Sequence, residues 1–128
     1  METLKKILVL IGLIASLISA AYANDGLATY YNIYNPSACY GFATPTDLIA
    51  AASPTIWEGL STCGRRYSVT CTGSTNAGTP HPCTGERVAV EIVDFCPGCQ
   101  GTFDLGQDAF AAIADLDAGV ILIEYDRV

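Results

Sequence analysis

Four stretches of the chain carry the residue pattern of β-strands. Residues 27–34 and 67–71 are rich in β-branched and aromatic side chains, and the second of them alternates strictly. Residues 88–95 are apolar at most positions of both parities, which predicts a central strand buried on both faces. Residues 120–125 predict a last strand. Regular pairing of these segments would give a mainly β domain.

Two further stretches favour helix. Residues 47–53 are rich in alanine and stop before a proline, so they predict a short helix or a helical turn. Residues 105–116 place apolar side chains at helical spacing, which predicts the one clear helix of the chain. Asp104 directly precedes that segment and is expected to act as its N-cap or first-turn acid. Residues 72–87 are polar and rich in Gly and Pro, and predict a long loop.

The N-terminus has the pattern of a secretion leader. Two lysines precede an apolar run over residues 7–18, and Ala21-Tyr22-Ala23 provides a small-x-small cleavage site. A membrane anchor is the alternative, but the run is shorter than the ~20 apolar residues that a spanning helix needs. We expect residues 1–23 to be a signal peptide and residues 24–128 to form a single secreted domain without membrane insertion.

The negative charge of the chain limits the classes of partner that it is expected to bind. The formal net charge is −7, and removal of Glu2, Lys5 and Lys6 with the leader makes it more negative. A strongly acidic surface repels nucleic acid and anionic membranes. Neutral polysaccharide or another protein is therefore the expected partner, and a monomer is the expected state.

The cysteine content indicates a disulfide framework. An even number of cysteines in a small secreted domain is the usual mark of such a scaffold. The alternative is a zinc site, which would need paired C-x-x-C units or histidines, whereas only Cys96 and Cys99 have that spacing and His81 is the only histidine. A redox C-x-x-C centre is a second alternative, but no helix start follows this pair. The six cysteines, all within residues 24–128, are Cys39, Cys63, Cys71, Cys83, Cys96 and Cys99.

An ordered set of short motifs resembles a known group. The set resembles the first domain of expansins and, within that group, the barwin-related plant natriuretic peptide-like proteins. Each motif is weak by itself, but their order and spacing extend over essentially the whole of residues 24–128. The motifs are Ala28–Tyr31, Ser37–Gly41, Trp57–Gly59, Cys63-Gly64, Tyr67-x-Val69-x-Cys71, Val90–Pro97, Thr102–Leu105, Ala109–Ala114 and the terminal Val128.

The resemblance implies both a fold and a bridge pattern. The fold is a six-stranded double-psi β-barrel with one short packed helix, stapled by disulfides. The implied bridges are Cys39–Cys63 and Cys71–Cys83, which leave Cys96 and Cys99 to pair with each other.

The positions of the carboxylates indicate whether the chain could cleave a glycosidic bond. Most glycosidases need two carboxyl groups that flank the scissile bond. In the family-45 endoglucanases that the chain resembles, the acid lies in a motif that matches Phe103-Asp104, and the base follows an aromatic pair similar to Tyr30-Tyr31. The corresponding residue is Asn32, which has no titratable carboxylate. The resemblance therefore implies a protein without hydrolytic activity, in which Asp104 is a vestige of the catalytic acid.

Four residues are candidates for a polysaccharide groove. They are Thr29, Tyr31, Asp94 and Asp104, and one tyrosine of the pair at positions 30 and 31 is expected to face the barrel interior while the other faces the groove. Structural roles compete with this interpretation, since Asp104 can cap a helix and Asp94 can bond a loop. Trp57 is expected to pack against neighbouring side chains. No metal and no cofactor is expected.

The resemblance implies a natriuretic peptide-like signalling or binding protein of the extracellular space, the apoplast in a plant. Such a protein would affect water and solute balance through a cell-surface receptor. The alternative is a non-lytic module that binds or loosens cell-wall polysaccharide. A glycoside hydrolase and a barwin-like defence protein are further alternatives.

Overall fold

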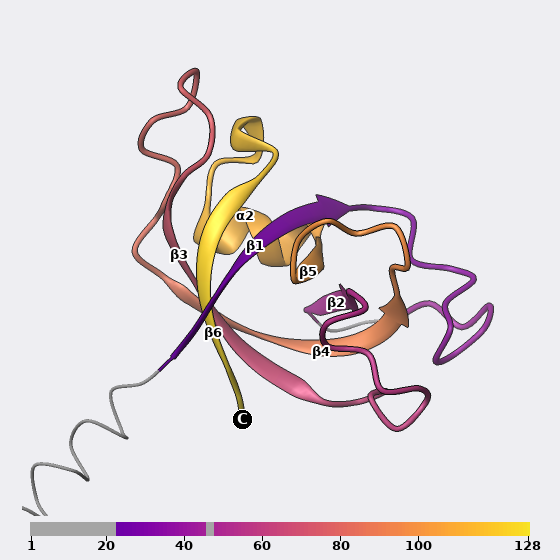
Figure 1. The fold of residues 1–128 in the computed structure, drawn as a ribbon. Helices are drawn as coiled ribbons and strands as arrows, with labels where there is room; N and C mark the ends of the chain where they lie inside the picture. Colours follow the sequence, from indigo (N-terminus) through magenta and orange to yellow (C-terminus); the bar gives the residue numbers. More distant parts are fainter. Residues whose placement is uncertain (1–22, 46–47) are drawn as a thin grey trace, which may run out of the picture.

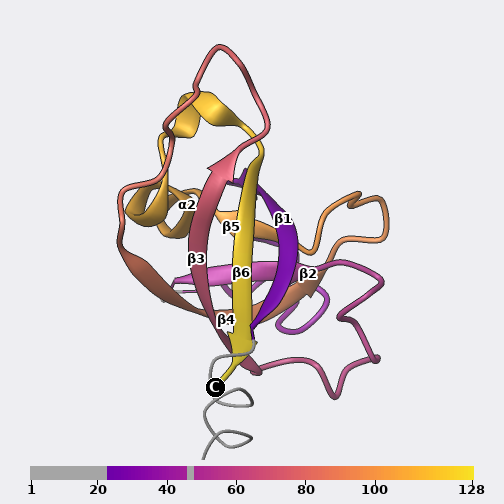
Figure 2. The ribbon, with the colours of Figure 1, turned by 60° about the vertical axis from the view of Figure 1, so that its left-hand side comes forward.

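Antiparallel strands with alternating burial form one wall of the protein. The computed structural model describes residues 23–45 and 48–128. In it, β6 (Ile121–Arg127) lies between β1 (Asn24–Tyr31) and β3 (Arg66–Ser74) and is antiparallel to both (Figure 2). Ile121 and Ile123 point into the core, whereas Leu122 and Glu124, which alternate with them, are exposed, as the two-residue period of a strand requires.

Three further strands close the wall into a barrel. β5 (Phe103–Gly106) is parallel to β1, β2 (Ile49–Ala52) is antiparallel to β5, and β4 (Arg87–Phe95) is parallel to β2 and antiparallel to β3 (Figure 1). The closed order is β1-β5-β2-β4-β3-β6. Closure leaves no free sheet edge. The predicted six-stranded barrel is thus confirmed, as are the strands at 67–71, 88–95 and 120–125, with small changes of their ends.

The helix predicted over residues 47–53 is wrong. Asp47 lies outside the described residues, and Ile49–Ala52 form strand β2, whose four side chains are all buried. Alanine favours helix as an isolated residue, but this segment pairs on both sides, with β4 and with β5. Tertiary pairing therefore overrides the local preference.

The second helix begins later than predicted, and Asp104 does not cap it. The helix α2 (Gln107–Ile113) has Gly106 at its N-cap with no side-chain hydrogen bond, and a short 3-10 turn, η1 (Leu116–Ala118), follows it. Asp104 and Leu105 instead lie in β5, where they pair with β1 and β2. The helical spacing of apolar residues in the sequence begins at residue 105 because β5 and α2 both bury apolar side chains in the same core.

The first strand is shifted from its predicted bounds of 27–34. β1 starts at Asn24, where pairing with Tyr125 of β6 begins, and ends at Tyr31. Tyr34 lies beyond the strand, where its hydroxyl accepts a hydrogen bond from the backbone N–H of Gln107. The aromatic run therefore continues past the strand because Tyr34 contacts the start of α2.

Aromatic side chains fill much of the core. Phe103 and Phe110 are fully buried, and Phe103 packs against Tyr67 and Tyr125 with ring centroids 5.1 and 5.2 Å away. Trp57 stacks on Phe95 at 5.0 Å with the rings 14° from parallel. This agrees with the packing role expected of Trp57. A core of this kind stabilises mainly by removing apolar surface from water.

All three bridges implied by the resemblance are present. They are Cys39–Cys63, Cys71–Cys83 and Cys96–Cys99, separated along the chain by 24, 12 and 3 residues. No free cysteine remains among the described residues. Each bridge fixes a connection between strands.

The bridges should differ in their contribution to stability. In the chain-entropy model, the contribution grows with the length of the loop that a bridge closes. We expect paired Cys→Ser replacement at Cys39 and Cys63 to lower the free energy of unfolding by about 3.5 kcal/mol, and at Cys96 and Cys99 by only about 2 kcal/mol. Urea denaturation of the two double variants tests this order. A larger loss for the Cys96/Cys99 pair would contradict it.

Candidate functional site

Thr29 and Asp104 form a hydrogen-bonded pair on adjacent parallel strands. The register of β1 and β5 places the two residues opposite each other. Thr29 Oγ1 donates to Asp104 Oδ1 at 2.9 Å, and both side chains are half-buried. One carboxylate oxygen of Asp104 thus has a fixed partner. This pair is the centre of the candidate site.

Asp94 lies one strand further along the barrel wall. Ala51 of β2 pairs with Asp94 on one side and with Asp104 on the other, so β2 separates the two acids. Strand spacing of ~4.8 Å puts their backbones about 10 Å apart. Asp94 Oδ1 accepts hydrogen bonds from the backbone N–H groups of Ala38 and Phe95, both at 2.8 Å. Asp94 therefore holds the 37–39 loop, the structural role that competed with its place in a groove.

The two neighbouring tyrosines face opposite ways, as predicted. Tyr30 packs against Phe110 of α2, with ring centroids 4.8 Å apart. Tyr31 lies on the carboxylate side, where burial, and then the negative charges of Asp94 and Asp104, raise the pKa of its phenol. Its hydroxyl is buried and has no hydrogen-bond partner among the described residues. A buried hydroxyl without a hydrogen-bond partner destabilises the fold, and for this reason buried polar atoms in proteins are almost always paired.

Replacing Tyr31 by Phe should therefore stabilise the fold. The substitution removes only the unpaired hydroxyl, and an unsatisfied buried donor costs about 1–3 kcal/mol. We expect the free energy of unfolding of Tyr31→Phe to rise by about 1 kcal/mol in urea denaturation. Tyr30→Phe is the matched control, because its ring packs on α2 and its hydroxyl is not buried without a partner. Destabilisation of Tyr31→Phe would show that the hydroxyl does find a partner.

Asn32, where the resemblance to family-45 endoglucanases places a catalytic base, carries an amide in place of a carboxylate. Asn32 is exposed just past the end of β1, and its Nδ2 donates to Gln107 Oε1 at 3.3 Å. An amide cannot take a proton from water, so this side chain cannot activate a nucleophile. Oδ1 of Asp94 is engaged by two backbone N–H groups. The hydroxyl of Thr29 and the carboxylate of Asp104 can bind and orient hydroxyl groups of a ligand.

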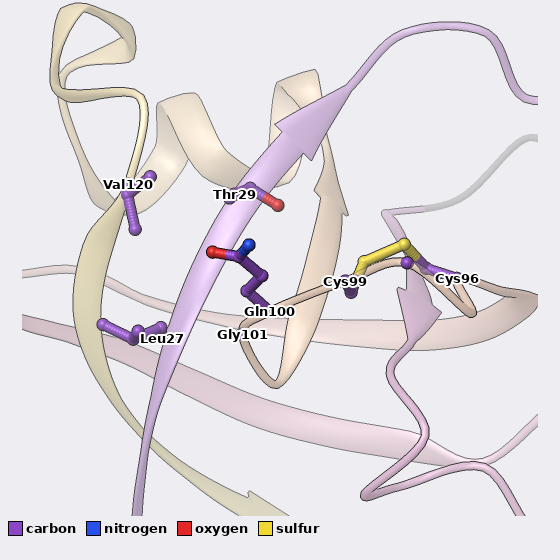
Figure 3. A pocket seen from close by; sticks show the side chains of 8 residues that line it. Leu27, Thr29, Cys96, Cys99, Gln100, Gly101 and Val120 are labelled. Atoms are coloured by element: carbon purple, nitrogen blue, oxygen red, sulfur yellow. A yellow bond between two sulfur atoms is a disulfide. The ribbon is translucent and has the colours of Figure 1, made fainter.

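A cavity of about 340 Å³ opens beside the Thr29–Asp104 pair. It lies between β1, the start of β6 and the loop 96–101 (Figure 3). Sequence reasoning missed this loop, although its Cys-Pro-Gly-Cys-Gln-Gly run marks a tight turn between two strands. The cavity is lined by Leu27, Thr29, Cys96, Gly98, Cys99, Gln100, Gly101 and Val120.

Gly101 lets the cavity loop approach β1. A Cβ atom at this position would lie 2.8 Å from the backbone oxygen of Leu27, closer than real contacts allow. The next residue, Thr102, donates its backbone N–H to the same oxygen at 2.8 Å. Only glycine therefore allows the loop and β1 to form the cavity wall together.

Burial also changes the pKa of Asp104, the acid of the site. Burial raises the pKa of the Asp104 carboxyl above its ordinary value, and the hydrogen bond from Thr29 opposes part of this effect. A carboxyl whose pKa is higher in the folded than in the unfolded state contributes most to stability below the unfolded pKa of about 4. That contribution is lost as the pH rises through the folded pKa.

Asp104→Asn should therefore stabilise the chain at neutral pH. The amide keeps an oxygen for Thr29 but carries no charge to desolvate. We expect its free energy of unfolding to exceed that of the wild type at pH 7 and the difference to vanish near pH 3, as urea denaturation over a pH series would measure. The control is Asp108→Asn, which removes an exposed acid from the first turn of α2 and should be neutral or slightly destabilising at pH 7. A destabilised Asp104→Asn at pH 7 would contradict the pKa shift.

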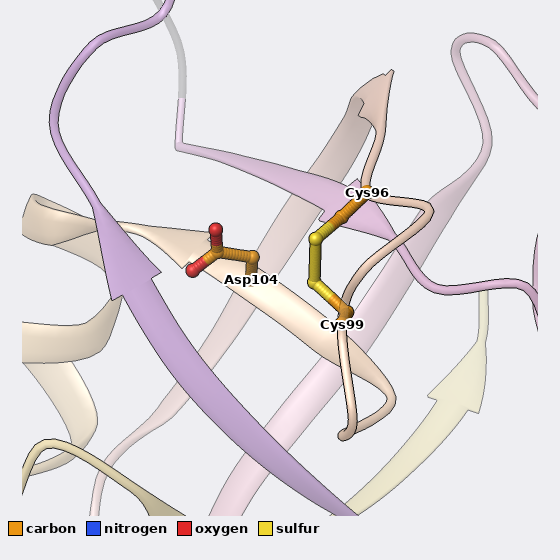
Figure 4. Close-up of side chains that lie close together, drawn as sticks. All are labelled: Cys96, Cys99 and Asp104. Carbon is orange, nitrogen blue, oxygen red and sulfur yellow. A yellow bond between two sulfur atoms is a disulfide. The ribbon is translucent and has the colours of Figure 1, made fainter.

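Three side chains that can ligate metals also meet at this wall. Cys96 Sγ, Cys99 Sγ and a carboxylate oxygen of Asp104 all lie within 4.8 Å of one another (Figure 4). The two sulfurs are joined in the Cys96–Cys99 bridge and have no thiolate lone pair to offer in this form. Within residues 23–45 and 48–128, no helix is long and apolar enough to cross a membrane.

Sequence comparison finds a matching family model and similar proteins in plants. A family model described as lytic transglycolase, of the double-psi β-barrel type, matches residues 49–125. The chain is 52% identical over 125 residues to an EG45-like domain containing protein of Citrus jambhiri, covering 95% of each chain.

Solved structures support the same fold. An expansin variant of Clavibacter michiganensis in complex with cellohexaose matches with a TM-score of 0.65 and 30% identity, covering 84% of this chain and 50% of that one. The chain thus spans about half the length of this expansin. A family-45 endoglucanase, EG27II, in complex with cellobiose matches with a TM-score of 0.60 over 83% of this chain and 80% of that one, and its 18% identity shows the fold alone.

Proposed function

The chain belongs to the EG45-like domain family of expansin-related double-psi β-barrels, and from this membership we propose that it is a non-hydrolytic module that binds cell-wall polysaccharide. The observation that carries the proposal is the Thr29–Asp104 pair beside an open cavity. The cellohexaose complex of the related expansin supports a β-linked glucan as the ligand.

The chemistry of the cavity suits a sugar. Thr29 lines the cavity, and Asp104 lies next to it behind that residue. Asp104 Oδ1 accepts the hydrogen bond from Thr29, so Oδ2 is the oxygen available to a ligand hydroxyl that reaches past Thr29. Charge-assisted hydrogen bonds of this type are stronger than neutral ones. Leu27 and Val120 offer apolar surface to the C–H face of a pyranose ring, and Gln100 adds an amide donor and acceptor. The volume is at the lower end of the range for small-ligand sites, enough for a short stretch of glycan.

Hydrolysis is not part of the proposal. The resemblance puts Asn32 where a catalytic base would stand, and Oδ1 of Asp94 is already engaged by two backbone N–H groups. Asp104 can still donate or accept a proton, but cleavage without a second group would leave water unactivated. Binding therefore accounts for the site better than glycoside cleavage.

The proposed place of action rests on the leader predicted from the sequence. We propose that residues 1–23 are removed and that residues 24–128 act outside the cell, where three disulfides persist. The relatives and solved structures that the chain resembles are EG45-like and expansin proteins, which support a cell-wall module and give no support to the signalling role implied by natriuretic peptide-like proteins. The alternative of a polysaccharide-binding module thus replaces it as the leading function.

Sedimentation with insoluble polysaccharide tests the proposal. The purified protein is mixed with cellulose, xylan and chitin, and the protein that remains in solution is measured together with released reducing sugar. We expect depletion by cellulose or xylan and no reducing sugar above the background. Serum albumin serves as the control for unspecific adsorption. Failure to bind any of the three would refute the binding function, and steady sugar release would refute its non-hydrolytic character.

A further inference from the structure

The carboxylates of Asp104 and Asp94 lie in one row of paired residues across the barrel wall. Asp104 of β5 pairs with Thr29 of β1 on one side and with Ala51 of β2 on the other. Ala51 in turn pairs with Asp94 of β4. Residues opposite each other on neighbouring strands point to the same face of a sheet. Ala51 is not part of the core cluster, so this row faces away from the barrel interior.

The phenol of Tyr31 lies near both of these charges. Tyr31 follows Thr29 by two positions on β1, so its side chain points to the same face of the wall. Burial, and then the charges of Asp94 and Asp104, raise the pKa of its phenol. Because the Coulomb interaction falls with distance, both carboxylates act on the space beside this ring. A ligand that binds beside Thr29 therefore meets the field of two acids.

No positive side chain on the same elements balances these acids. Within the part of the chain that the structure describes, β1, β2, β5 and the 96–101 loop contain no Lys, Arg or His. The positive side chains of this part lie on or next to β3, β4 and β6, apart from His81 in the loop before β4. The arginines are Arg65, Arg66, Arg87 and Arg127.

Two of these arginines already face acids of their own. Arg65 Nη2 forms an ion pair with Glu58 Oε2 at 2.8 Å. Arg66 stands opposite Glu91 in the register of β3 and β4. A positive charge beside a negative one contributes little net field further away. These arginines therefore do not offset the charge of the site.

The other positive groups are distant from the site. At ~3.3 Å per residue, Arg87 lies about 23 Å from Asp94 along β4. Removal of the leader would add an amino group at Asn24, about 17 Å from Thr29 along β1. Arg127 ends β6 beyond the residue that pairs with Asn24, so it lies at the same far end. All these distances exceed the Debye length of about 8 Å at physiological salt.

We propose that this site selects neutral glycans and rejects uronates, with Asp104 and Asp94 as the residues that decide between the two. The inference rests on the proposed binding function and adds the class of sugar to it. A uronate carries a carboxylate where glucose carries a hydroxymethyl group. The hydroxyl of glucose can donate a hydrogen bond to an acid, whereas a carboxylate of the sugar can only accept one. Like charges that meet in an interface weaken binding strongly.

Partial burial makes this rejection stronger than it would be on an open surface. Burial raises the pKa of Asp104, which shows that water stabilises its charge only incompletely. Repulsion between charges is larger and less screened in such surroundings. The cavity beside it is lined by uncharged side chains, among them Leu27, Gln100 and Val120 (Figure 3). A uronate would lose water there without gaining a positive partner.

Calorimetry with two ligands of equal length and linkage tests the inference. Cellohexaose is the neutral probe, and the charged probe is the same hexamer with every hydroxymethyl group oxidised to a carboxylate. EDTA is present, so that no divalent cation can bridge the acids of protein and ligand. We expect the charged probe to bind at least about tenfold more weakly at low ionic strength. The ratio of the two affinities should fall at high ionic strength because salt screens the repulsion.

Two variants remove the charges and keep the hydrogen bonds. Asp94→Asn retains an oxygen for the N–H groups of Ala38 and Phe95, and Asp104→Asn retains one for Thr29. Each should lower the ratio of the two affinities, and the double variant should bring it close to one. The matched control is Asp108→Asn, which removes an exposed charge from α2 and should keep the wild-type ratio. If Asp94→Asn does not fold by circular dichroism, Asp104→Asn carries the test.

Two outcomes would overturn the proposed selectivity. They are equal or tighter binding of the charged probe by the wild type, and a wild-type ratio in variants that lack the charges. In both cases cellohexaose still binds, so the polysaccharide-binding function stands. A chain that binds neither probe would instead refute the binding function, and the selectivity with it. The two failures are therefore distinguishable in one set of titrations.

Discussion

Asp104→Asn is expected to weaken binding to a soluble cello-oligosaccharide by about 10- to 100-fold. The carboxylate is the only charged group of the Thr29–Asp104 pair, and a hydrogen bond to a charged group contributes about 1.5–3 kcal/mol. A loss of 1.4 kcal/mol corresponds to a factor of ten in the dissociation constant. In the amide, Oδ1 keeps the bond from Thr29, so a donor replaces the acceptor that a sugar hydroxyl would meet.

Calorimetry with cellohexaose measures this effect, and Asp108→Asn is the matched control. That acid is exposed on α2, outside the cavity, and its replacement makes the same chemical change. The control should bind like the wild type. Because Asp104→Asn is also expected to be more stable at neutral pH, a loss of binding would not reflect unfolding. Equal affinities of Asp104→Asn and the wild type would remove Asp104 from the binding site.

Phe103→Ala is expected to lower the free energy of unfolding by about 3–5 kcal/mol, the range measured for buried Phe→Ala changes. Phe103 lies on β5 with 0% of its surface exposed, in contact with the rings of Tyr67 and Tyr125. β5 joins β1 to β2, so a cavity there would loosen the strand that carries Asp104. Small domains have a total stability of about 5–15 kcal/mol, and this loss would take much of it.

The chain contains its own control for this change. Phe42 is 84% exposed in the loop before β2, and Phe42→Ala removes the same atoms without opening a core cavity. Its effect should stay within about 0.5 kcal/mol, as for most surface substitutions. Urea denaturation of both variants, followed by tyrosine and tryptophan fluorescence, gives the comparison. Equal losses would mean that β5 does not anchor the core.

Strands with a strong local pattern could be predicted from the sequence. Residues 67–71 and 88–95, and all but the first of residues 120–125, lie in strands of the barrel, because alternation or a continuous apolar run reflects burial directly. The opposite directions of Tyr30 and Tyr31 also followed from strand alternation. The bridges and the barrel type needed the ordered motif set, since six cysteines allow many pairings.

Segments whose state depends on distant partners could not be predicted. Ile49–Ala52 form a strand because β4 and β5 flank them, and Asp104 lies in β5 because β1 and β2 pair on both sides. Local propensity contributes only tenths of a kcal/mol per residue, so pairing on both sides outweighs it. The helix α2 begins later than predicted for the same reason.

The sequence by itself determined the residue types of the site: an acid at position 104, a hydroxyl at 29 and an amide where a base would stand at 32. Only the tertiary structure decided what these residues face. Barrel closure brings β1 beside β5, so that residues 75 positions apart share a hydrogen bond, and it carries the 96–101 loop over β1 to form the cavity. Side-chain chemistry is local, whereas the distances between side chains are set by strand pairings that no single segment encodes.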